Sequence, residues 1–467
     1  MRPSTVHDTL EFYARLRRRQ PMTALLESLG EVDETTSRYC YVGVSPAEIL
    51  RVERDVATLT NVATGVVHSN VHWLDVLSRF AVLGPNTGDR LQTGSIGYVG
   101  YGMKNDFERL ARRIPDDTCI PDVLVVRYDV VFIYDRLTSQ SWWAYAPGRR
   151  SVVDVHENEE REASPVACRP FVSLGDLVPD SSRAEYLRRV DRAIEYIRAG
   201  DTFQANITTR FSGPCKGDAF TLYTRLREET PNPFFAYLDF PDPVLSTSPE
   251  RFLSISGRRI SSCPIKGTVR CVVDGRDQRD ALVGSVKDRA ENTIIVDLVR
   301  NDIGRICVHG SVVVDELCGI RRFNNLYHLV SIISGTLRPG VMLGDVLRAT
   351  FPGGSVTGAP KIRTMDIIEE LESTRRGPYC GAIGFFGSCG WVNTSIAIRT
   401  MYITGGRVYL HAGGGIVADS HAPDEYDELL LKVEKMALCL DATRGPPVVA
   451  PLPIEVSRVR QDRTLPS

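Results

Sequence analysis

The stretch YCGAIGFFGSCGWVNTSIAIRTMYITGGRVYLHA, residues 379–412, carries the clearest signal for the fold. It contains three runs that are rich in β-branched and aromatic residues. The runs are separated by the short segments Ser388-Cys389-Gly390 and Gly405-Gly406. Apolar runs joined by short glycine-containing turns favour hairpins over helices. The stretch therefore predicts a three-stranded antiparallel meander.

Three segments outside this meander have the pattern of helices. In SRAEYLRRVDRAIEYIRAG, residues 182–200, Ser182 and Glu185 have capping-box spacing, apolar residues recur at helical period and Gly200 ends the pattern. Residues 287–304 and 423–440 also have a helical pattern. Residues 202–211 alternate in the way of a strand. Together with the meander, these segments predict an α/β protein of the α+β type with mainly antiparallel sheets.

The chain divides into four regions by composition. Residues 1–155 contain short β-like runs, and residues 122–146 predict two strands joined near Asp135. Residues 156–182 are charged and then contain prolines, which is typical of a linker. The main region follows at 183–441, and the Pro-rich tail at 442–467 is expected to fray.

Composition excludes several classes of protein. Hydrophobic residues make up 43% of the 467 residues and charged residues 24%, which is ordinary globular usage. The formal net charge of −2 gives no basic excess for nucleic acid or an anionic membrane surface. Eleven cysteines without a C-x-x-C pair indicate reduced thiols. With no apolar signal segment, the sequence predicts a soluble cytoplasmic protein without nucleic-acid or membrane partners.

Two predicted helices each offer a pair of carboxylates. Glu425 and Glu428 are three residues apart, Lys432 follows one turn later, and Asp288 and Glu291 have the same spacing on the other helix. If the helices face one another, these oxygens suit a hard divalent cation such as Mg²⁺. The alternative is that they are ordinary solvated helix faces.

Two glycine-rich segments have features of an anion site. Gly413, Gly414 and Gly415 directly follow a predicted strand and form either a backbone nest for an anion or a loose turn. The segment FPGGSVTGAPK, residues 351–361, has the glycine spacing of a phosphate-binding loop. Ala359 and Pro360 stand where that loop needs Lys and Ser or Thr, so the segment is not one.

Four single residues each have two possible interpretations, one as part of a chemical site and one as an ordinary structural residue. Lys266, in PIKGT, is either a solvated charge or a pocket-facing amine. Arg399, placed on a strand opposite Ile396 and Ile398, either pairs with an acid or binds a substrate carboxylate. Glu250 is either a general acid or part of a rim salt bridge. His328 is either catalytic or a hydrogen-bonded core residue.

Seven motifs in the order of the chain resemble the chorismate-utilising enzymes: PIKGT, KDRAENTIIVDLVRND, HLVSIISGTL, GSVTGAPK, GPYCGAIGF, AIRT, and GGGIVADS followed by EYDELLLK. The resemblance is dense over residues 183–441 and looser in residues 1–155. It implies a single large α/β unit in which two stacked, mainly antiparallel sheets are flanked by outer helices.

The resemblance also implies roles for these residues. Mg²⁺ would be held by Glu291 and Glu428, with Glu425 and Asp288 in or near its coordination sphere, and would bind the ring carboxylate of chorismate. Glu250 would be the general acid that assists departure of the 4-hydroxyl. The substrate would be contacted by Gly267, Thr268, His328, Tyr379, Arg399, Gly413, Gly414, Gly415 and Lys432.

Lys266 narrows the choice within the family. Members that make anthranilate usually carry alanine in this motif, whereas lysine is typical of the aminodeoxychorismate synthase component I type. There the lysine attacks ring carbon C2, and ammonia then enters at C4 to give 4-amino-4-deoxychorismate, on the route to 4-aminobenzoate and folate. Gln204 stands where the isochorismate- and salicylate-forming members carry a water-activating lysine. The alternatives are anthranilate synthase component I and, more remotely, a non-catalytic chorismate- or amino-acid-binding regulatory protein.

Two further expectations follow from the resemblance. The chain has no G-x-C-x-G amidotransferase elbow, so ammonia would come from a separate glutaminase subunit. The segment LLES, which ends at Ser28, resembles a tryptophan-binding motif, with Pro233, Phe234 and Phe235 as the partner segment. This pocket would either bind tryptophan or be a structural remnant.

Overall fold

The computed structural model describes residues 2–3, 8–30, 38–84, 92–111, 113–161, 169–270, 276–323 and 326–440. Its helices are α1 (Thr9–Arg19), α2 (Trp73–Phe80), α3 (Lys104–Phe107), α4 (Arg150–Arg161), α5 (Arg183–Arg198), α6 (Ala219–Glu229), α7 (Arg276–Gly284), α8 (Val286–Gly304), α9 (Leu343–Thr350), α10 (Lys361–Leu371) and α11 (Ala422–Leu438), with 3₁₀ turns η1 (Tyr101–Met103) and η2 (Gly354–Val356).

The strands of the first half are β1 (Arg2–Pro3), β2 (Thr23–Glu27), β3 (Tyr39–Glu53), β4 (Val56–Asn61), β5 (Val67–Ser69), β6 (Gly94–Val99), β7 (Val123–Asp135), β8 (Gln140–Tyr145), β9 (Phe171–Ser173), β10 (Val178–Pro179), β11 (Gln204–Gly217) and β12 (Phe234–Asp239). Those of the second half are β13 (Val244–Ser248), β14 (Arg251–Ser256), β15 (Arg259–Cys263), β16 (Ile265–Arg270), β17 (Val313–Phe323), β18 (Leu326–Thr336), β19 (Gly358–Ala359), β20 (Ala382–Gly387), β21 (Trp391–Ile396), β22 (Thr400–Thr404) and β23 (Arg407–Ile416). Among the described residues every strand pair is antiparallel.

The predicted helices are present. The capping box of α5 is formed, because the Ser182 hydroxyl accepts from the Glu185 N–H and the Glu185 carboxylate accepts from the Ser182 N–H. Helices α8 and α11 cover the other two predicted helical segments, and Pro423 lies in the first turn of α11. The two strands expected around Asp135 are β7 and β8, which pair with each other.

The meander prediction is wrong in one respect. The run predicted as one middle strand is two strands, β21 and β22, which are separated by residues 397–399. Strand β21 pairs with β20 and β14, whereas β22 pairs with β23 and β13. The break occurs where Arg399 adopts a left-handed backbone conformation with φ of 50°. A strand pattern in the sequence does not reveal such a turn, because a non-glycine residue seldom adopts it.

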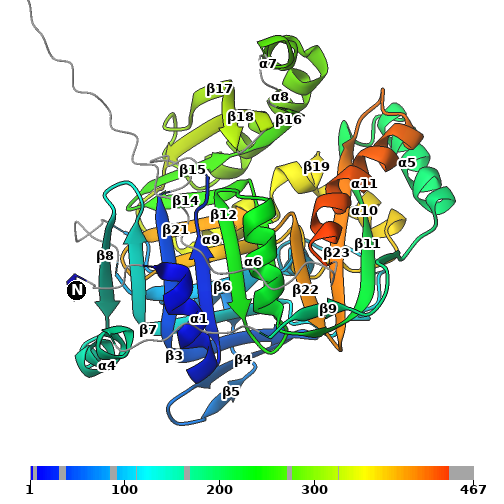
Figure 1. The fold of residues 1–467 in the computed structure, drawn as a ribbon. Coiled ribbons are helices and arrows are strands. Elements are labelled where there is room, and N and C mark those ends of the chain that lie inside the picture. Colours follow the sequence, from blue (N-terminus) through cyan, green and yellow to red (C-terminus); the bar gives the residue numbers. More distant parts are fainter. Residues whose placement is uncertain are drawn as a thin grey trace, which may run out of the picture.

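Two sheet layers pack face to face in the centre of the molecule (Figure 1). A buried cluster between them takes side chains from strands of both layers and from three loop positions, and none from the described helices. Its members include Tyr41, Tyr98, Leu238, Phe385 and Tyr402. Tyr41 and Phe385 stack with ring centroids 4.4 Å apart. The cluster confirms the predicted stacked arrangement, since a core without helices requires that sheet faces meet.

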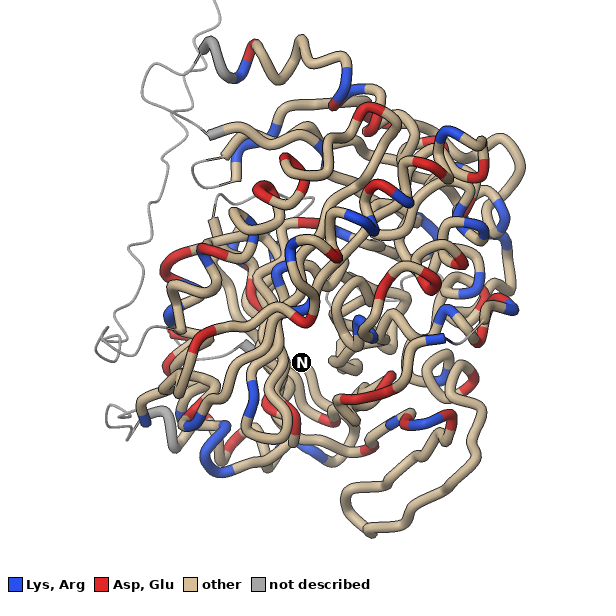
Figure 2. The backbone as a smooth tube through the Cα atoms, turned by 90° about the vertical axis from the view of Figure 1, so that its right-hand side faces the viewer, with Lys and Arg blue, Asp and Glu red and all other residues tan. Residues whose placement is uncertain are grey.

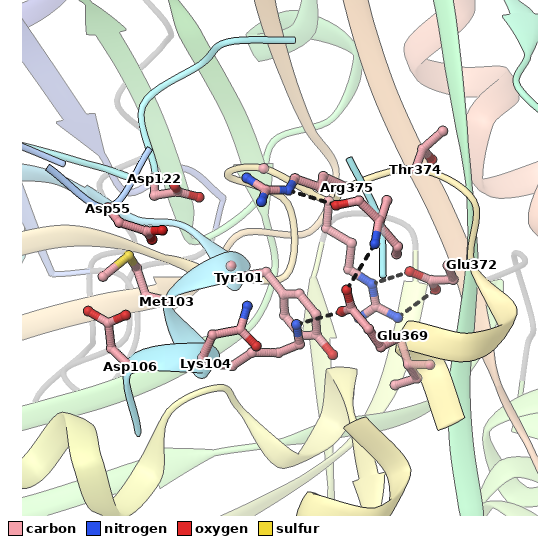
Figure 3. Close-up of a pocket in the computed structure, with 16 residues that line it drawn as sticks. Asp55, Tyr101, Met103, Lys104, Asp106, Asp122, Glu369, Glu372, Thr374 and Arg375 are labelled. Carbon is pink, nitrogen blue, oxygen red and sulfur yellow. Dashed lines mark hydrogen bonds and ion pairs between the residues drawn. The ribbon is translucent and has the colours of Figure 1, made fainter. Parts of the chain in front are cut away.

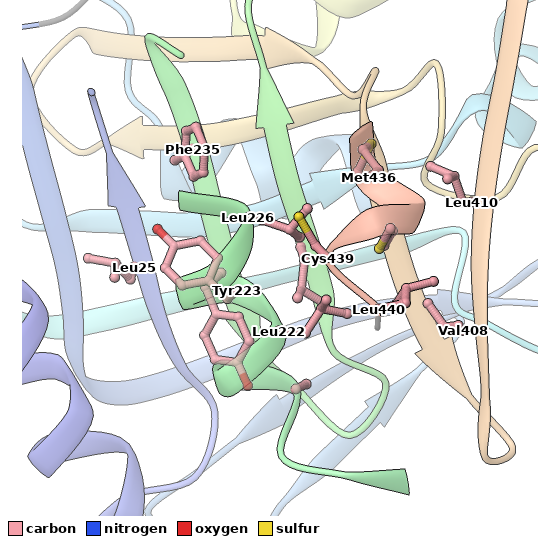
Figure 4. Packing of buried hydrophobic residues seen from close by; sticks show 14 of the residues in the cluster. Leu25, Leu222, Tyr223, Leu226, Phe235, Val408, Leu410, Met436, Cys439 and Leu440 are labelled. Carbon is pink, nitrogen blue, oxygen red and sulfur yellow. The ribbon is translucent and has the colours of Figure 1, made fainter. Parts of the chain in front are cut away.

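Helices cover the outer faces of the layers. A second cluster packs α6 and α11 against β2, β12 and β23, and Figure 4 shows Leu222 and Leu226 of α6 near Met436 of α11. On the other side, α2, α8 and α9 pack against further strands through residues that include Leu77, Ile295 and Leu347. The fold is therefore the predicted α/β unit of stacked antiparallel sheets with outer helices.

The N-terminal and main regions are joined by hydrogen-bonded strands. β2 pairs with β12, and β6 pairs with β20, so strands from both regions share the same sheets. Part of the predicted linker is regular structure, because α4 extends to Arg161 and β9 and β10 both pair with β11. The predicted tail, 442–467, lies outside the described residues.

Basic and acidic residues are mixed along the chain, and Figure 2 shows Lys and Arg interspersed with Asp and Glu on the backbone. This agrees with the nearly neutral formal charge of the sequence. No helix among the described residues has the length and apolarity to cross a membrane.

Candidate active site

A cavity of about 600 Å³ lies between β16, α8, β23 and α11. It collects every residue that the sequence predicted for catalysis, substrate binding and metal binding. These are Glu250, Lys266, Gly267, Thr268, Asp288, Glu291, His328, Tyr379, Arg399, Gly413, Gly414, Gly415, Glu425, Glu428 and Lys432. The first and last of them, Glu250 and Lys432, are 182 residues apart in the sequence, so the fold rather than local sequence assembles them.

Lys266 reaches the cavity from an irregular strand. The pairing of β16 with β18 shifts register between Lys266 and Thr268, and Gly267 between them has a φ of 65°. A left-handed residue of this kind is easiest for glycine. The Lys266 side chain is only 14% exposed, and its Nζ lies 3.9 Å from Oε2 of Glu291. Burial lowers the pKa of Lys266, while the carboxylates of Glu291 and Glu250 oppose that shift.

Glu250 is buried deeper in the same cavity. Its residue surface is 5% exposed, and burial raises its pKa to about 7. Hydrogen bonds from the Ser355 side chain and the Ile265 backbone, and the charge of Lys266, oppose that rise. A carboxyl group with a pKa near neutrality can carry a proton to a leaving group and take it back.

Arg399 projects from the break between β21 and β22 rather than from a strand face, which corrects its predicted placement. Its carbonyl accepts hydrogen bonds from the N–H and hydroxyl of Thr247, which fix the turn. Within the described part of the chain, no carboxylate pairs with the guanidinium, and burial lowers its pKa. A half-buried, unpaired arginine in a cavity suits a ligand carboxylate.

His328 is neutral and oriented by one neighbour. Its Nδ1 lies 2.9 Å from the Thr268 hydroxyl, and burial together with the nearby Arg399 charge lowers its pKa to about 3. Its Nε2 has no hydrogen-bond partner among the described residues. The imidazole therefore offers an uncharged hydrogen-bonding group to a ligand in the cavity.

Gly413, Gly414 and Gly415 lie inside β23, where they pair with Thr208, Ile207 and Asn206 of β11. They therefore form neither the nest nor the loose turn that the sequence left open. These glycines matter because they let neighbouring side chains approach the backbone of β23 closely. A Cβ at Gly415 would lie 2.4 Å from Nε2 of Gln204 and 3.1 Å from Nζ of Lys266.

Gly414 and Gly413 likewise allow close contact, here between β23 and the facing helix α11. A Cβ at Gly414 would lie 3.1 Å from Oε2 of Glu425. The carbonyl of Gly413 accepts a hydrogen bond of 2.9 Å from Nζ of Lys432. Without side chains, this part of β23 lets α11 bring its charged groups against the sheet.

The two carboxylate pairs face the cavity from α8 and α11. Burial raises the pKa of Glu291, and the charges of Asp288 and Glu425 add to that rise. Glu428 lies nearer the solvent, and the charge of Lys432, at 2.8 Å, lowers its pKa. Glu425 accepts a hydrogen bond from the Ser420 hydroxyl.

These carboxylates fit Mg²⁺ by their chemistry. The donors are all oxygens, and the mutual repulsion at Glu291 is of the kind that a cation would relieve. Within the described ranges, no three acidic, His or Cys side chains come close enough to complete a metal site alone. Mg²⁺ commonly takes only one or two protein carboxylates and completes its shell with substrate oxygens and water.

Sequence reasoning missed several residues of the cavity wall, among them Asn206, Lys287, Ser355, Val356 and His411. Asn206 is two residues beyond Gln204 on β11, so the two-residue period of a strand could have indicated it. Ser355 and Val356 belong to the segment that does not form a phosphate loop but still lines the cavity. His411 stacks on Tyr379 with ring centroids 5.1 Å apart, and no sequence pattern identifies this contact.

The segments predicted to form a tryptophan pocket lie side by side but do not line this cavity. β2 and β12 pair Glu27 with Phe235, and the Ser28 hydroxyl donates to the Tyr39 carbonyl. The ring of Phe234 lies 5.5 Å from the Arg251 guanidinium. Tryptophan binding at Ser28, Pro233, Phe234 and Phe235 stays a prediction.

The sequence matches one known protein family and several curated relatives over most of its length. A family described as chorismate binding enzyme matches residues 31–438. Aminodeoxychorismate synthase component 1 of Salmonella typhimurium is 35% identical over 443 residues, which cover 92% of this chain and 95% of that protein. Anthranilate synthase component 1 of Thermus thermophilus is 36% identical over 447 residues, which cover 91% and 95%.

Solved structures agree. Anthranilate synthase component I from Streptococcus pneumoniae superposes with a TM-score of 0.77 at 29% identity, covering 87% of this chain and 94% of that one. The menaquinone-specific isochorismate synthase MenF from Escherichia coli shares the fold, with a TM-score of 0.67 at 14% identity over 94% and 96% of the two chains. The family match over most of the chain and the relatives at 35% and 36% identity show that this protein belongs to the chorismate binding enzymes.

Proposed function

We propose that the protein aminates chorismate at ring carbon C4 and releases 4-amino-4-deoxychorismate and water. The observation that carries the proposal is the partly desolvated Lys266 amine in one cavity with Glu250, whose pKa of about 7 suits proton transfer. An amine nucleophile and a carboxylic acid are the two groups that an allylic displacement of hydroxide needs. The relative from Salmonella typhimurium bears the name of this activity.

The first step joins Lys266 to the substrate. The neutral amine of Lys266 attacks C2, the ring double bond shifts, and the C4–oxygen bond breaks. Glu250 gives its proton to the departing hydroxyl, which leaves as water, and Lys266 carries the positive charge of the new C–N bond. Burial favours the neutral amine that this attack requires.

The second step restores the lysine. Ammonia attacks C4, the double bond shifts back, and the C2–nitrogen bond breaks with its electrons returning to Lys266 as a neutral amine. The new ammonium group at C4 gives a proton to the Glu250 carboxylate. Chorismate and ammonia have then become 4-amino-4-deoxychorismate and water, the enolpyruvyl group is retained, and both side chains have regained their starting states.

The remaining cavity residues bind the dianionic substrate. The Arg399 guanidinium, which has no carboxylate partner among the described residues, and the Nε2 of His328 line the cavity as ligand-binding groups. Glu291 and Glu428 would hold Mg²⁺, with Asp288 and Glu425 beside them, and the ion would neutralise the ring carboxylate. Lys432 keeps Glu428 ionised and so available as a ligand.

Ammonia is proposed to come from a separate glutaminase subunit. The relatives are named component 1, which implies a second component in those enzymes. This chain lacks the G-x-C-x-G segment of an amidotransferase nucleophile. Ammonium salt at high concentration would replace the partner in a simple assay.

Anthranilate synthesis is the second candidate, because anthranilate synthase components are also similar to this chain. Incubation with chorismate, Mg²⁺ and ammonium chloride, followed by mass analysis, separates the two activities. The proposal predicts 4-amino-4-deoxychorismate, which retains the enolpyruvyl carbons. Anthranilate with an equal amount of pyruvate would establish the second candidate, and unchanged chorismate would favour a binding protein.

A further inference from the structure

A second pocket lies behind the active-site cavity, between the segment 101–106 and α10 with the residues that follow it (Figure 3). Its volume is about 40 Å³, which suits one or two molecules of the size of water or ammonia. Its wall includes Tyr101, Asn105, Glu369, Thr374 and Arg376. None of these residues belongs to the wall of the active-site cavity.

One side chain links the walls of the two cavities. The Arg376 guanidinium lines the small pocket and donates 2.8 Å and 2.7 Å hydrogen bonds to the carbonyls of Val356 and Asn206, which line the active-site cavity. Glu372 holds the guanidinium through two further bonds, of 2.9 Å and 2.7 Å. Figure 3 shows Glu372, with the dashed lines of its hydrogen bonds, on the side of the pocket away from Asp55 and Asp106. The wall between the two cavities therefore contains the Arg376–Glu372 ion pair, hydrogen-bonded to the main chain of Val356 and Asn206.

Buried polar atoms on both sides of this barrier have no hydrogen-bond partner among the described residues. On the outer side these are the Tyr101 hydroxyl and Oδ1 of Asn105, and Tyr101 is only 4% exposed. On the inner side it is Nδ2 of Asn206. Buried polar groups almost always bind something. Small polar molecules that donate and accept hydrogen bonds, bound on each side of the barrier, would satisfy all three.

The charges of the pocket favour ammonium outside and ammonia inside. The pocket wall includes the carboxylates Asp55, Asp106 and Asp122, which Figure 3 shows on the side away from Glu372. Deeper in, the Tyr101 ring has the Lys104 ammonium 5.1 Å from its centroid and the Arg376 guanidinium carbon 4.3 Å from it. Both cations are ion-paired, Lys104 with Glu369 at 2.8 Å and Arg376 with Glu372 at 2.7 Å. No charge is left over at this point to pair with an ammonium ion, and an unpaired ion is costly to bury, so neutral ammonia is the species that fits here.

The pocket opens to a larger groove. Asp55, Met103 and Asp106 line both the pocket and a neighbouring hollow of about 530 Å³. A continuous series of hollows therefore leads from this groove into the pocket, and from the pocket to Arg376 and the active-site cavity.

We propose that this pocket is an ammonia-binding site and the entrance by which ammonia reaches the active-site cavity, past Arg376. The inference rests on the proposed amination. When the guanidinium moves, the carbonyls of Asn206 and Val356 that it releases can accept N–H groups of ammonia. Chorismate, a much larger dianion, uses the wide mouth between α8 and α11.

The test measures the KM for ammonia and the KM for chorismate separately, with ammonium chloride at one fixed pH and no partner subunit. Thr374→Trp fills the pocket from its rim. Tyr101→Phe removes only the unpartnered hydroxyl and keeps the ring. Ser373→Trp is the matched control, because it adds the same bulk at the neighbouring exposed residue, which is not part of the pocket wall.

Both pocket variants should raise the KM for ammonia, Tyr101→Phe by about fivefold in line with one lost hydrogen bond, and Thr374→Trp by more. The KM for chorismate should stay within about twofold of the parent value, and Ser373→Trp should change neither constant. If the Thr374→Trp variant does not fold, the KM for ammonia of the Tyr101→Phe variant decides the test alone. An unchanged KM for ammonia in the folded pocket variants would overturn the proposal that the pocket is the entrance for ammonia. Failure of the parent protein to form any aminated product would overturn the proposed function and this inference with it.

Discussion

Nζ of Lys266 and Oε2 of Glu291 lie 3.9 Å apart in a mostly buried cavity. This separation exceeds that of a good hydrogen bond, so the two groups interact as charges without fixing one another. The lysine is thus left able to reach a substrate. The same carboxylate carries a raised pKa because it is buried near Asp288 and Glu425. One short contact therefore relates the proposed nucleophile to the proposed metal site.

Glu291→Gln and Glu428→Gln should each reduce amination by about 10²-fold and raise the Mg²⁺ concentration that gives half-maximal rate. A neutral amide is a poor Mg²⁺ ligand, and even the loss of groups behind a ligand costs 10- to 100-fold. Initial rates over a Mg²⁺ titration test this. Asp297→Asn, on an exposed position of the same helix α8, is the control and should match the parent. Normal rates and Mg²⁺ dependence in both glutamine variants would place the metal elsewhere.

The rate should fall as the pH rises through about 7, because Glu250 must be protonated to act on the leaving hydroxyl. At saturating ammonia, the pH profile of kcat reports this group. Glu250→Gln should lose about 10²- to 10⁴-fold in rate, the range for a general acid, and should lose this pH limb as well. A glutamine variant with the parent's profile would exclude Glu250 from proton transfer.

Glu250 should also influence stability. Its pKa in the folded protein, about 7, lies above the ordinary value of 4.5, so the folded state binds the proton more tightly. Its contribution is therefore full below pH 4.5 and is lost as the pH rises through 7. Urea unfolding at pH 6 and pH 8 should show a smaller decrease in midpoint for Glu250→Gln than for the parent. An equal decrease in the two proteins would contradict this.

Arg399→Met should separate stability from binding. In the absence of substrate the arginine is half-buried with no carboxylate partner in the described part of the chain, so its replacement should raise the thermal midpoint. The KM for chorismate should rise about 10- to 100-fold, because a buried charge pair with the substrate carboxylate is lost. Thermal unfolding and steady-state kinetics check the two effects. A lower midpoint with an unchanged KM would mean that Arg399 is structural.

Gly415→Ala should damage the site more than the fold. Its methyl group would lie 2.4 Å from Nε2 of Gln204 and 3.1 Å from Nζ of Lys266. Both neighbours are ends of flexible side chains, so they can move at a cost of about 1–3 kcal/mol in stability. The expected result is a large decrease in kcat with circular dichroism unchanged. Gly304→Ala is the control, since its methyl group would meet nothing within 4 Å. Equal kcat values in the two variants would contradict the close approach.

The regular elements and the composition of the site could be predicted from the sequence, because they depend on local patterns. Capping by Ser182 and Glu185, the helical period of α8 and α11, and the i, i+3 carboxylates are all properties of short segments. The predicted site residues do line one cavity, which the family motifs made predictable.

The rest depends on contacts between distant segments. Arg399 reads as a strand residue, and only the pairing of β21 with β14 and of β22 with β13 shows that the chain turns there. Gly413 to Gly415 read as a loop, but pairing with β11 makes them strand residues. The stacking of His411 on Tyr379 and the link from Arg376 to Asn206 also join segments with no shared local pattern.

Lys266→Ala should lower amination by about 10²-fold or more, because the covalent route is removed. Chorismate should still bind through Arg399 and the metal. Lys266→Arg is the more discriminating change, since it keeps the positive charge but cannot act as an amine nucleophile. Steady-state rates and chorismate binding, measured by calorimetry, test both variants. Full activity of the arginine variant would show that Lys266 acts only by its charge.

The covalent role of Lys266 is tested most directly by peptide mass mapping of the parent protein after incubation with chorismate and Mg²⁺, with ammonia withheld. The account predicts a peptide containing Lys266 whose mass has increased by that of chorismate less one water. The increase should disappear when ammonium chloride is added, as 4-amino-4-deoxychorismate is released. Active enzyme with an unmodified Lys266 peptide, together with full activity of Lys266→Arg, would contradict the account.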